Sequence, residues 1–111
     1  MASVTEMIAS ARRPADAVLE HVGPGSQIVV NGYNGEPQTV IDALEAAGDR
    51  LTDVRLHEML APRTRPSIEG KIPGLRHVSW FLSPHDKDAF HGCRCDTAPS
   101  SWWPRPKPAT P

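Results

Sequence analysis

The segment from Asn31 to Glu36 is the first place in the sequence where chemistry could occur. It contains Gly32 and Gly35 and follows the apolar run 28–30. Glycines allow backbone angles and close approaches that other residues forbid. Pro37 is typical of a helix start, where free N–H groups favour an anion. The segment therefore either borders a ligand or only turns a strand into a helix.

Phosphate-binding motifs do not occur in this segment. The sequence has no G-x-x-x-x-G-K-[ST], and Gly32-Gly35 is not G-x-G-x-x-G. The carboxylate of Glu36 stands where a phosphate would bind and would repel it. A helix start stabilises this anion and makes it a weak nucleophile, so we expect Glu36 to cap or support the loop rather than react. Glu58 is expected in a solvated or paired environment.

Metal ligation is a second chemistry to consider, because His85, His91, Cys93 and Cys95 lie within eleven residues. The spacing differs from the usual C-x₂₋₄-C pair, and the chain has no second cysteine and histidine cluster. We therefore interpret these residues as polar side chains on a short helix and expect no metal site. A zinc protein stays a remote alternative. The remaining histidines are expected in ordinary hydrogen-bonded positions; they include His21, His57 and His77.

The elements that position these residues follow from hydrophobic periodicity and turn signals. Helices are expected over 4–22 with an interruption at Pro14, over 37–47 and over 83–90. Strands are expected over 28–30, 54–59 and 77–82, with a fourth starting at 94–96, and 61–74 should be loop. This order predicts an α/β fold with a mainly parallel sheet flanked by helices. Both faces of such a sheet are usually covered, so we expect a doubly buried first strand and Trp80 in the core.

Two long stretches of this sequence resemble the amino-terminal portion of the acetyl-CoA hydrolase/transferase family. That family has a G-x-x-x-E-P loop, which Gly32, Glu36 and Pro37 match. The helix that follows this loop in the family is matched by residues 41–44. The family's serine-proline turn is matched by Ser83-Pro84, and its G-R-x-D stretch is matched in register by residues 94–96. Lys87 and Ala89 lie between these two matches. The similarity extends from about Ser10 to Asp96. Cys93, Lys87 and Thr97 depart from the family pattern.

The resemblance implies a class I coenzyme A transferase built from two similar α/β domains, of which this chain holds a truncated first domain. In that family a glutamate attacks the acyl-CoA thioester, and a small carboxylate later accepts the coenzyme. The glutamate belongs to the second domain, so the resemblance assigns no catalytic residue to this chain. It implies that the first-domain loop forms a wall of the substrate pocket, with substrate-binding positions at Gly32, Tyr33, Asn34, Gly35 and Glu36.

Length and charge exclude several other classes. The chain has 111 residues, enough for one modest domain, and a net charge of −1 without a basic patch, which argues against nucleic-acid binding. It has no stretch of 18 apolar residues and no signal-peptide h-region, so we expect a cytoplasmic protein that does not bind a membrane. Coenzyme A would be a substrate rather than a bound cofactor, and the full-length form of the family leaves a homodimer open.

The carboxyl-terminal tail differs from the rest in composition. Five of the 12 prolines lie between Pro99 and Pro111, which prevents a regular helix or strand there. We divide the chain into a partial domain, 1–96, and a proline-rich tail, 97–111. The tail is interpreted as the product of a frameshift near Asp96; a disordered terminus and an SH3-type ligand around Pro104 are the alternatives. Trp102 and Trp103 would be exposed, which argues against a native terminus.

These observations favour an amino-terminal fragment of an acyl-CoA:carboxylate CoA-transferase or acetyl-CoA hydrolase that is inactive alone. The alternative is a small non-enzymatic α/β binding module.

Overall fold

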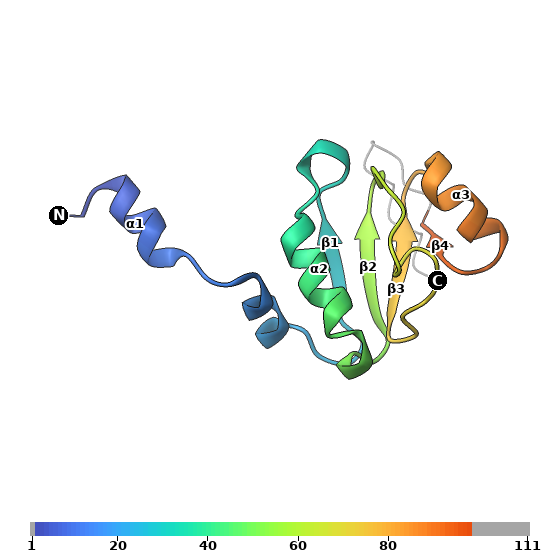
Figure 1. Cartoon of the computed structure of the whole chain (residues 1–111), viewed down its shortest axis with the longest axis horizontal. Coiled ribbons are helices and arrows are strands. Elements are labelled where there is room, and N and C mark those ends of the chain that lie inside the picture. The colour runs from blue at the N-terminus through green and yellow to red at the C-terminus, as the bar shows by residue number, and fades with distance from the viewer. Residues whose placement is uncertain (1, 99–111) are drawn as a thin grey trace, which may run out of the picture.

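Four parallel strands form one sheet in the computed structural model, which describes residues 2–98 (Figure 1). They follow the order β1-β2-β3-β4, with every neighbouring pair parallel. The register places Ile28 opposite Leu56, and Leu56 opposite His77. This confirms the expected α/β class with a parallel sheet. The bounds are β1 Gln27–Val30, β2 Val54–Glu58, β3 Leu75–Ser79 and β4 Asp96–Thr97.

Helical segments precede the sheet and connect its strands. Pro14 separates the first two, and Ser3 and Ser83 accept backbone N–H groups at the starts of the first and last. No regular helix or strand interrupts 61–74, as expected from its prolines and glycines. The α-helices are α1 Val4–Ala11, α2 Gln38–Ala46 and α3 Pro84–His91; the 3-10 segments are η1 Ala15–His21, η2 Tyr33–Gly35 and η3 Gly48–Arg50.

Two strands differ from the sequence expectation. The third begins at Leu75 and ends at Ser79, earlier than the expected 77–82, because a turn at Pro73 and Gly74 starts it and the chain leaves the sheet at Trp80. The first strand is not buried on both faces, since Val29 is 66% exposed. The second error arises because an apolar run shows strand propensity but does not show which face of the strand is covered.

The apolar core has two separate parts. The larger joins α2 to the amino-terminal halves of the strands, with η1 packed against it. The smaller joins the 61–74 segment to α3 and the residues before β4. The larger cluster consists of Ile41, Leu44, Val54, Leu56 and Leu75, and the smaller of Ala61, Ile68, Ala89 and Cys95.

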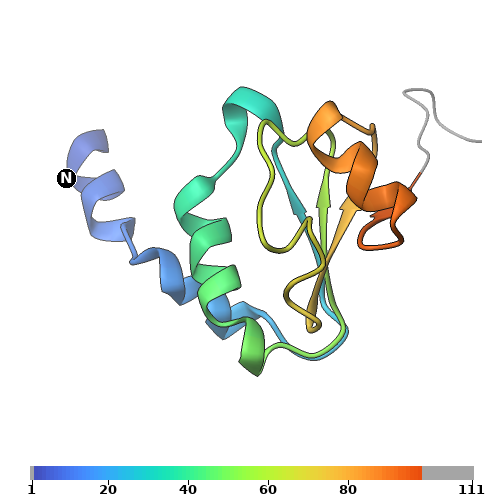
Figure 2. The ribbon, with the colours of Figure 1, turned by 45° about the vertical axis from the view of Figure 1, so that its right-hand side comes forward.

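The sheet is covered mainly on one side. Figure 2 shows α2 and the 61–74 segment together on one side of the strands, with η1 and α1 farther out in the same direction. On the opposite side of β1 and β2, the side chains of Val29 and Arg55 are exposed. We call this surface, which also carries Gln27 and His57, the open face. Covering of both faces was therefore a wrong prediction for residues 2–98, although Val78 of β3 is buried on that side.

None of the helices within residues 2–98 combines the length and apolar character needed to cross a membrane.

The last described residues belong to the sheet. The side-chain hydroxyl of Thr97 and the backbone N–H of Ala98 both donate to the carbonyl of Ser79. The boundary that we placed between residues 96 and 97 therefore falls within β4. The tail interpretations for Pro99–Pro111 fall outside the described residues.

Candidate functional site

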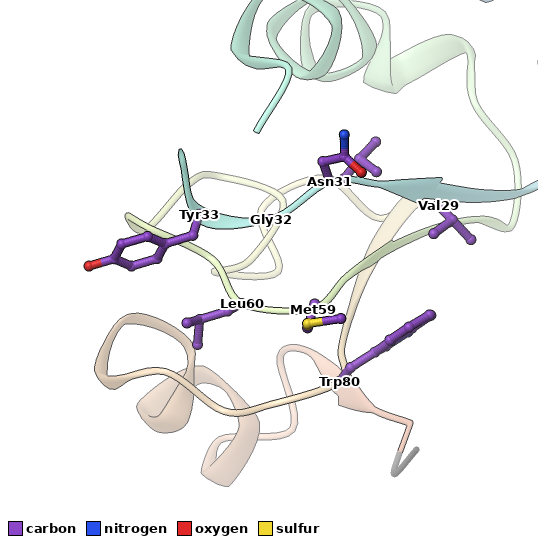
Figure 3. A pocket seen from close by; sticks show the side chains of 8 residues that line it. Val29, Asn31, Gly32, Tyr33, Met59, Leu60 and Trp80 are labelled. Carbon is purple, nitrogen blue, oxygen red and sulfur yellow. The ribbon is translucent and has the colours of Figure 1, made fainter. Parts of the chain in front are cut away.

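A hollow of about 290 Å³ lies at the carboxyl ends of β1, β2 and β3 (Figure 3). Ligands of open parallel sheets bind at this edge. The Trp80 ring lies beside Met59 and extends in the direction of Val29, while the Tyr33 ring points to the opposite end. The walls of the hollow are mainly apolar, with polar groups on Asn31 and Tyr33. The lining residues are Val29, Val30, Asn31, Gly32, Tyr33, Met59, Leu60 and Trp80.

Gly32 has a packing role in the glycine loop, which we define as Asn31–Glu36. A Cβ on Gly32 would lie 2.8 Å from the carbonyl oxygen of Leu60 and 2.9 Å from its nitrogen. The backbone N–H of Tyr33 donates to the same carbonyl over 2.9 Å. The loop therefore lies directly on the chain leaving β2, and the absence of a side chain at Gly32 permits this contact. The expected close approach is confirmed, but it is to the protein's own backbone.

The left-handed backbone in this loop occurs at Tyr33, where φ is 52°, and not at a glycine. A non-glycine residue with positive φ is uncommon and marks a fixed local conformation. This conformation places the Tyr33 side chain at the rim of the hollow. Asn34 and Gly35 are exposed and do not line the hollow. Of the five positions implied by the resemblance, the structure brings Gly32 and Tyr33 to this site.

Glu36 points away from the hollow into a buried ion-pair cluster. Its Oε1 accepts hydrogen bonds from Arg65 Nη2 at 2.9 Å and from Nε at 3.3 Å. Nη1 of Arg65 also bonds to Asp42 at 2.7 Å and to Glu45 at 3.0 Å. Burial lowers the pKa of Arg65, but the three carboxylates raise it by more, so the guanidinium stays charged. We expected Glu36 to cap or support the loop. No side chain caps the start of α2, so its contact is the supporting one with Arg65.

Glu58 is buried, so the solvated alternative of the expectation is wrong; the residue is paired, with the carboxyl of Glu36 rather than with a cation. Its side chain is 1% exposed and lies beside Glu36. Burial, and next the adjacent Glu36 carboxyl, raise the pKa of Glu58 to about 8. At neutral pH this carboxyl keeps its proton, and the neutral acid can donate that proton to Glu36. Two carboxyls can then be buried together with a single positive partner, Arg65.

His77 and Asp86 form a second buried polar pair beside Glu58. The His77 Nε2 is 3.9 Å from Asp86 Oδ2, and neither atom has a hydrogen-bond partner within residues 2–98. Burial lowers the pKa of His77 to about 4 despite the nearby carboxylates, so the ring is neutral at pH 7. Asp86 also accepts from the hydroxyl of Ser83. The expectation of an ordinary hydrogen-bonded position fails at the Nε2 of His77.

The cysteines and remaining histidines do not form a metal site in the described part of the chain. No group of three or more metal-ligating side chains comes together there. Cys93 and Cys95 are free, and His85 and His91 are exposed on α3. Burial raises the pKa of the Cys95 thiol to about 11. This thiol is therefore a packed core group rather than a nucleophile.

The sequence analysis did not predict that Arg65 would be the centre of the ion-pair cluster. It also did not predict the hollow beside Trp80. Arg65 lies in a proline-rich loop with no periodicity, so no local pattern marks it. A usable signal was the excess of acids on α2, since Asp42 and Glu45 stand three residues apart on one face of the helix and need a basic partner. Trp80 was expected in the core of a sheet covered on both faces, but it is half-buried and lines the hollow.

Comparisons of the chain with protein-family models, curated proteins and solved structures found no match.

Proposed function

We propose that this chain is the amino-terminal α/β portion of a coenzyme A transferase or acyl-CoA hydrolase, and that the hollow accepts the acyl or carboxylate group of the substrate. The proposal rests on the resemblance and on one observation: a small apolar hollow whose wall includes Gly32 and Tyr33 at the carboxyl edge of the sheet. Its volume, about 290 Å³, is at the lower end of the range for ligand sites. A short acyl group suits that size.

The described residues lack a nucleophile at this site. No carboxylate lines the hollow. Glu36 is bound to Arg65, and Glu58 is protonated and buried beneath the opposite side of the sheet. A glutamate that attacks a thioester must be ionised and accessible. The chain therefore contributes a binding wall, and a second domain would supply the reacting glutamate.

Chemical-shift mapping by NMR tests this proposal. Butyrate and butyryl-CoA, added separately to the ¹⁵N-labelled chain, should shift the amides of Gly32, Tyr33 and Leu60, and the CoA ester should bind more tightly. Val29→Glu places a negative charge in the wall and should abolish both effects. Gln27→Glu, two residues earlier on the same face, is the matched control and should leave them unchanged. Absence of shifts at these amides with either compound contradicts the proposal.

A second function, a non-enzymatic binding module for small apolar molecules, is favoured by the apolar walls of the hollow. The same experiment separates the two functions. A module of this kind would bind butanol and butyrate equally well and would gain nothing from the coenzyme. A transferase wall should prefer the CoA ester, because the family's substrate extends beyond the acyl group.

A further inference from the structure

We propose that one proton, shared by the buried carboxyls of Glu36 and Glu58, holds the glycine loop on the end of β2, and that loss of this proton releases the loop from the wall of the hollow. We call this carboxyl pair with its proton the latch. The latch makes the hollow sensitive to pH. It does not depend on which molecule the hollow binds, because it consists of contacts of the glycine loop within its own chain.

The glycine loop borders both the hollow and the side chain of Glu58. Gly32 lines the hollow beside Leu60 (Figure 3), and a Cβ added at Gly32 would lie 3.5 Å from Cγ of Glu58. At the other end of the loop, the side chain of Glu36 turns inward and lies beside Glu58. One short loop therefore joins the hollow to the carboxyl pair, so that a movement of the pair reaches the wall of the hollow.

A proton is the group that can join the two carboxyls. Oε2 of Glu36 and Oε2 of Glu58 are buried, and neither has a hydrogen-bond partner within residues 2–98. An ionised carboxyl only accepts hydrogen bonds, so two ionised carboxyls cannot bond to each other. One proton turns one of them into a donor and removes one of the two buried charges. The pair therefore titrates as a unit.

The groups that face Glu58 from the surrounding elements favour the protonated pair. Burial, the carboxyl of Glu36 and that of Asp86 on α3 raise the pKa of Glu58 to about 8, although Arg65 acts in the opposite direction. Arg65 is also shared with two carboxylates of α2. The ring of His77 on β3 carries no compensating charge at neutral or alkaline pH, because burial lowers its pKa to about 4. The β1 residue opposite Glu58 is apolar.

Loss of the proton should move the loop rather than the strand. Glu58 is the last residue of β2, and its backbone carbonyl accepts from the N–H of Trp80 at 3.0 Å. The loop instead holds Tyr33 at a φ of 52°, a conformation that persists only where the surrounding contacts enforce it. The N–H of Tyr33 donates to the carbonyl of Leu60. Repulsion between two buried carboxylates breaks this attachment more easily than the pairing of the strands.

Release of the loop changes the hollow, because Gly32 and Tyr33 are part of its wall. A molecule that contacts these residues binds the form that keeps the proton. Binding in the hollow and proton uptake by the pair therefore strengthen each other.

Hydrogen exchange of the Tyr33 amide, followed by NMR on the full chain at pH 6.5 and 9, tests the latch. At pH 9 this amide should exchange at least about tenfold faster in the wild-type chain than in Glu58→Gln, whose side chain keeps a donor at any pH. At pH 6.5 the two proteins should differ much less. The N–H of Arg55, bonded within the sheet, should stay protected in both. Glu20→Gln makes the same change at an exposed position and should behave as the wild type.

Two results overturn the latch. One is a Tyr33 amide that exchanges as slowly in the wild-type chain at pH 9 as in Glu58→Gln. The other is loss of protection at Tyr33 and Arg55 together, because the whole sheet then opens rather than the loop. Circular dichroism checks that the variant folds. If it does not, the wild-type chain alone decides, through the comparison of these two amides at the two pH values.

Butyrate adds a measurement that rests on the proposed function. Its charge is constant between pH 6.5 and 9. At pH 9 about a tenth of the wild-type molecules keep the proton of Glu58, so butyrate should bind them about tenfold more weakly than Glu58→Gln. Equal affinities would overturn the coupling between the latch and the hollow. If butyrate binds neither protein at any pH, the proposed function is contradicted, and hydrogen exchange alone decides on the latch.

Discussion

The guanidinium of Arg65 contacts the carboxylate of Glu36 at 2.9 Å, joining the glycine loop to a segment 29 residues later in the chain. Through the same side chain, the 61–74 segment is tied to α2. The wall of the hollow therefore depends on a contact that lies outside it.

Replacing Arg65 by Met should destabilise the protein strongly. The change leaves the buried carboxylate of Glu36 without its cation, and breaking one side of a buried pair costs about 3–5 kcal/mol. Urea unfolding at pH 7 measures the loss. Arg63→Met, at an exposed position in the same segment, is the control and should change stability by less than about 0.5 kcal/mol. Equal effects of the two substitutions would contradict the role given to Arg65.

The protonated Glu58 should make the protein less stable as the pH rises toward 8. Its pKa is raised from 4.5 to about 8, so between these values the folded state holds a proton that the unfolded state has lost. The free energy of unfolding should fall with rising pH in this window, by up to about 1.4 kcal/mol per pH unit. Glu58→Gln, which cannot ionise, should flatten the decline between pH 6.5 and 8. An unchanged slope in this variant would show that Glu58 is ionised in the fold.

His77 should act in the opposite direction at acid pH. Its pKa is lowered from 6.5 to about 4, so between these values the unfolded state binds a proton that the folded state refuses. The contribution of His77 to stability should therefore fall as pH decreases from 6.5 to 4, and between pH 6.5 and 4.5 it opposes the gain from Glu58. Acid denaturation followed by circular dichroism measures this fall, and His77→Gln should shift the midpoint to lower pH. A midpoint that does not move would indicate that the buried imidazole is already charged.

Gly32→Ala should disturb the loop, because the new Cβ would lie within 3 Å of two backbone atoms of Leu60. Overpacking of this kind costs about 1–3 kcal/mol. Thermal unfolding gives the cost, and the Tyr33 and Leu60 amide resonances report local movement. Gly23→Ala is the matched control, since nothing lies within 4 Å of its added Cβ and its φ is not positive. Should Gly32→Ala match that control, close packing is not the reason for this glycine.

The architecture could be predicted from local patterns, but the environment of its polar groups could not. Pro14, Ser83 and the Ile28-Val29-Val30 run mark their elements in the sequence, and the structure has these elements at those places. Glu58 and His77 stand in alternation with apolar residues and look like ordinary strand positions. Their burial depends on which side of the sheet the distant 61–74 segment covers, and no local pattern carries that information.

The glycine loop illustrates the same limit. Its position after the first strand followed from the sequence, and so did the need for close approach at Gly32. The sequence did not show that Glu36 would turn inward, because its partner Arg65 lies in an irregular segment. Similarly, positive φ was expected of a glycine and occurs at Tyr33.

The polar layer made by Glu36, Glu58 and His77 separates the two apolar clusters of the core. Clusters that do not touch can lose their packing at different times, since each local opening has its own free energy. The 61–74 segment also packs on the larger cluster through Ile72, whereas α3 contributes Ala89 and Phe90 to the smaller cluster alone. The α3 end can therefore open while α2 and the first three strands stay folded, so amide protons of α3 should exchange with solvent before those of β2.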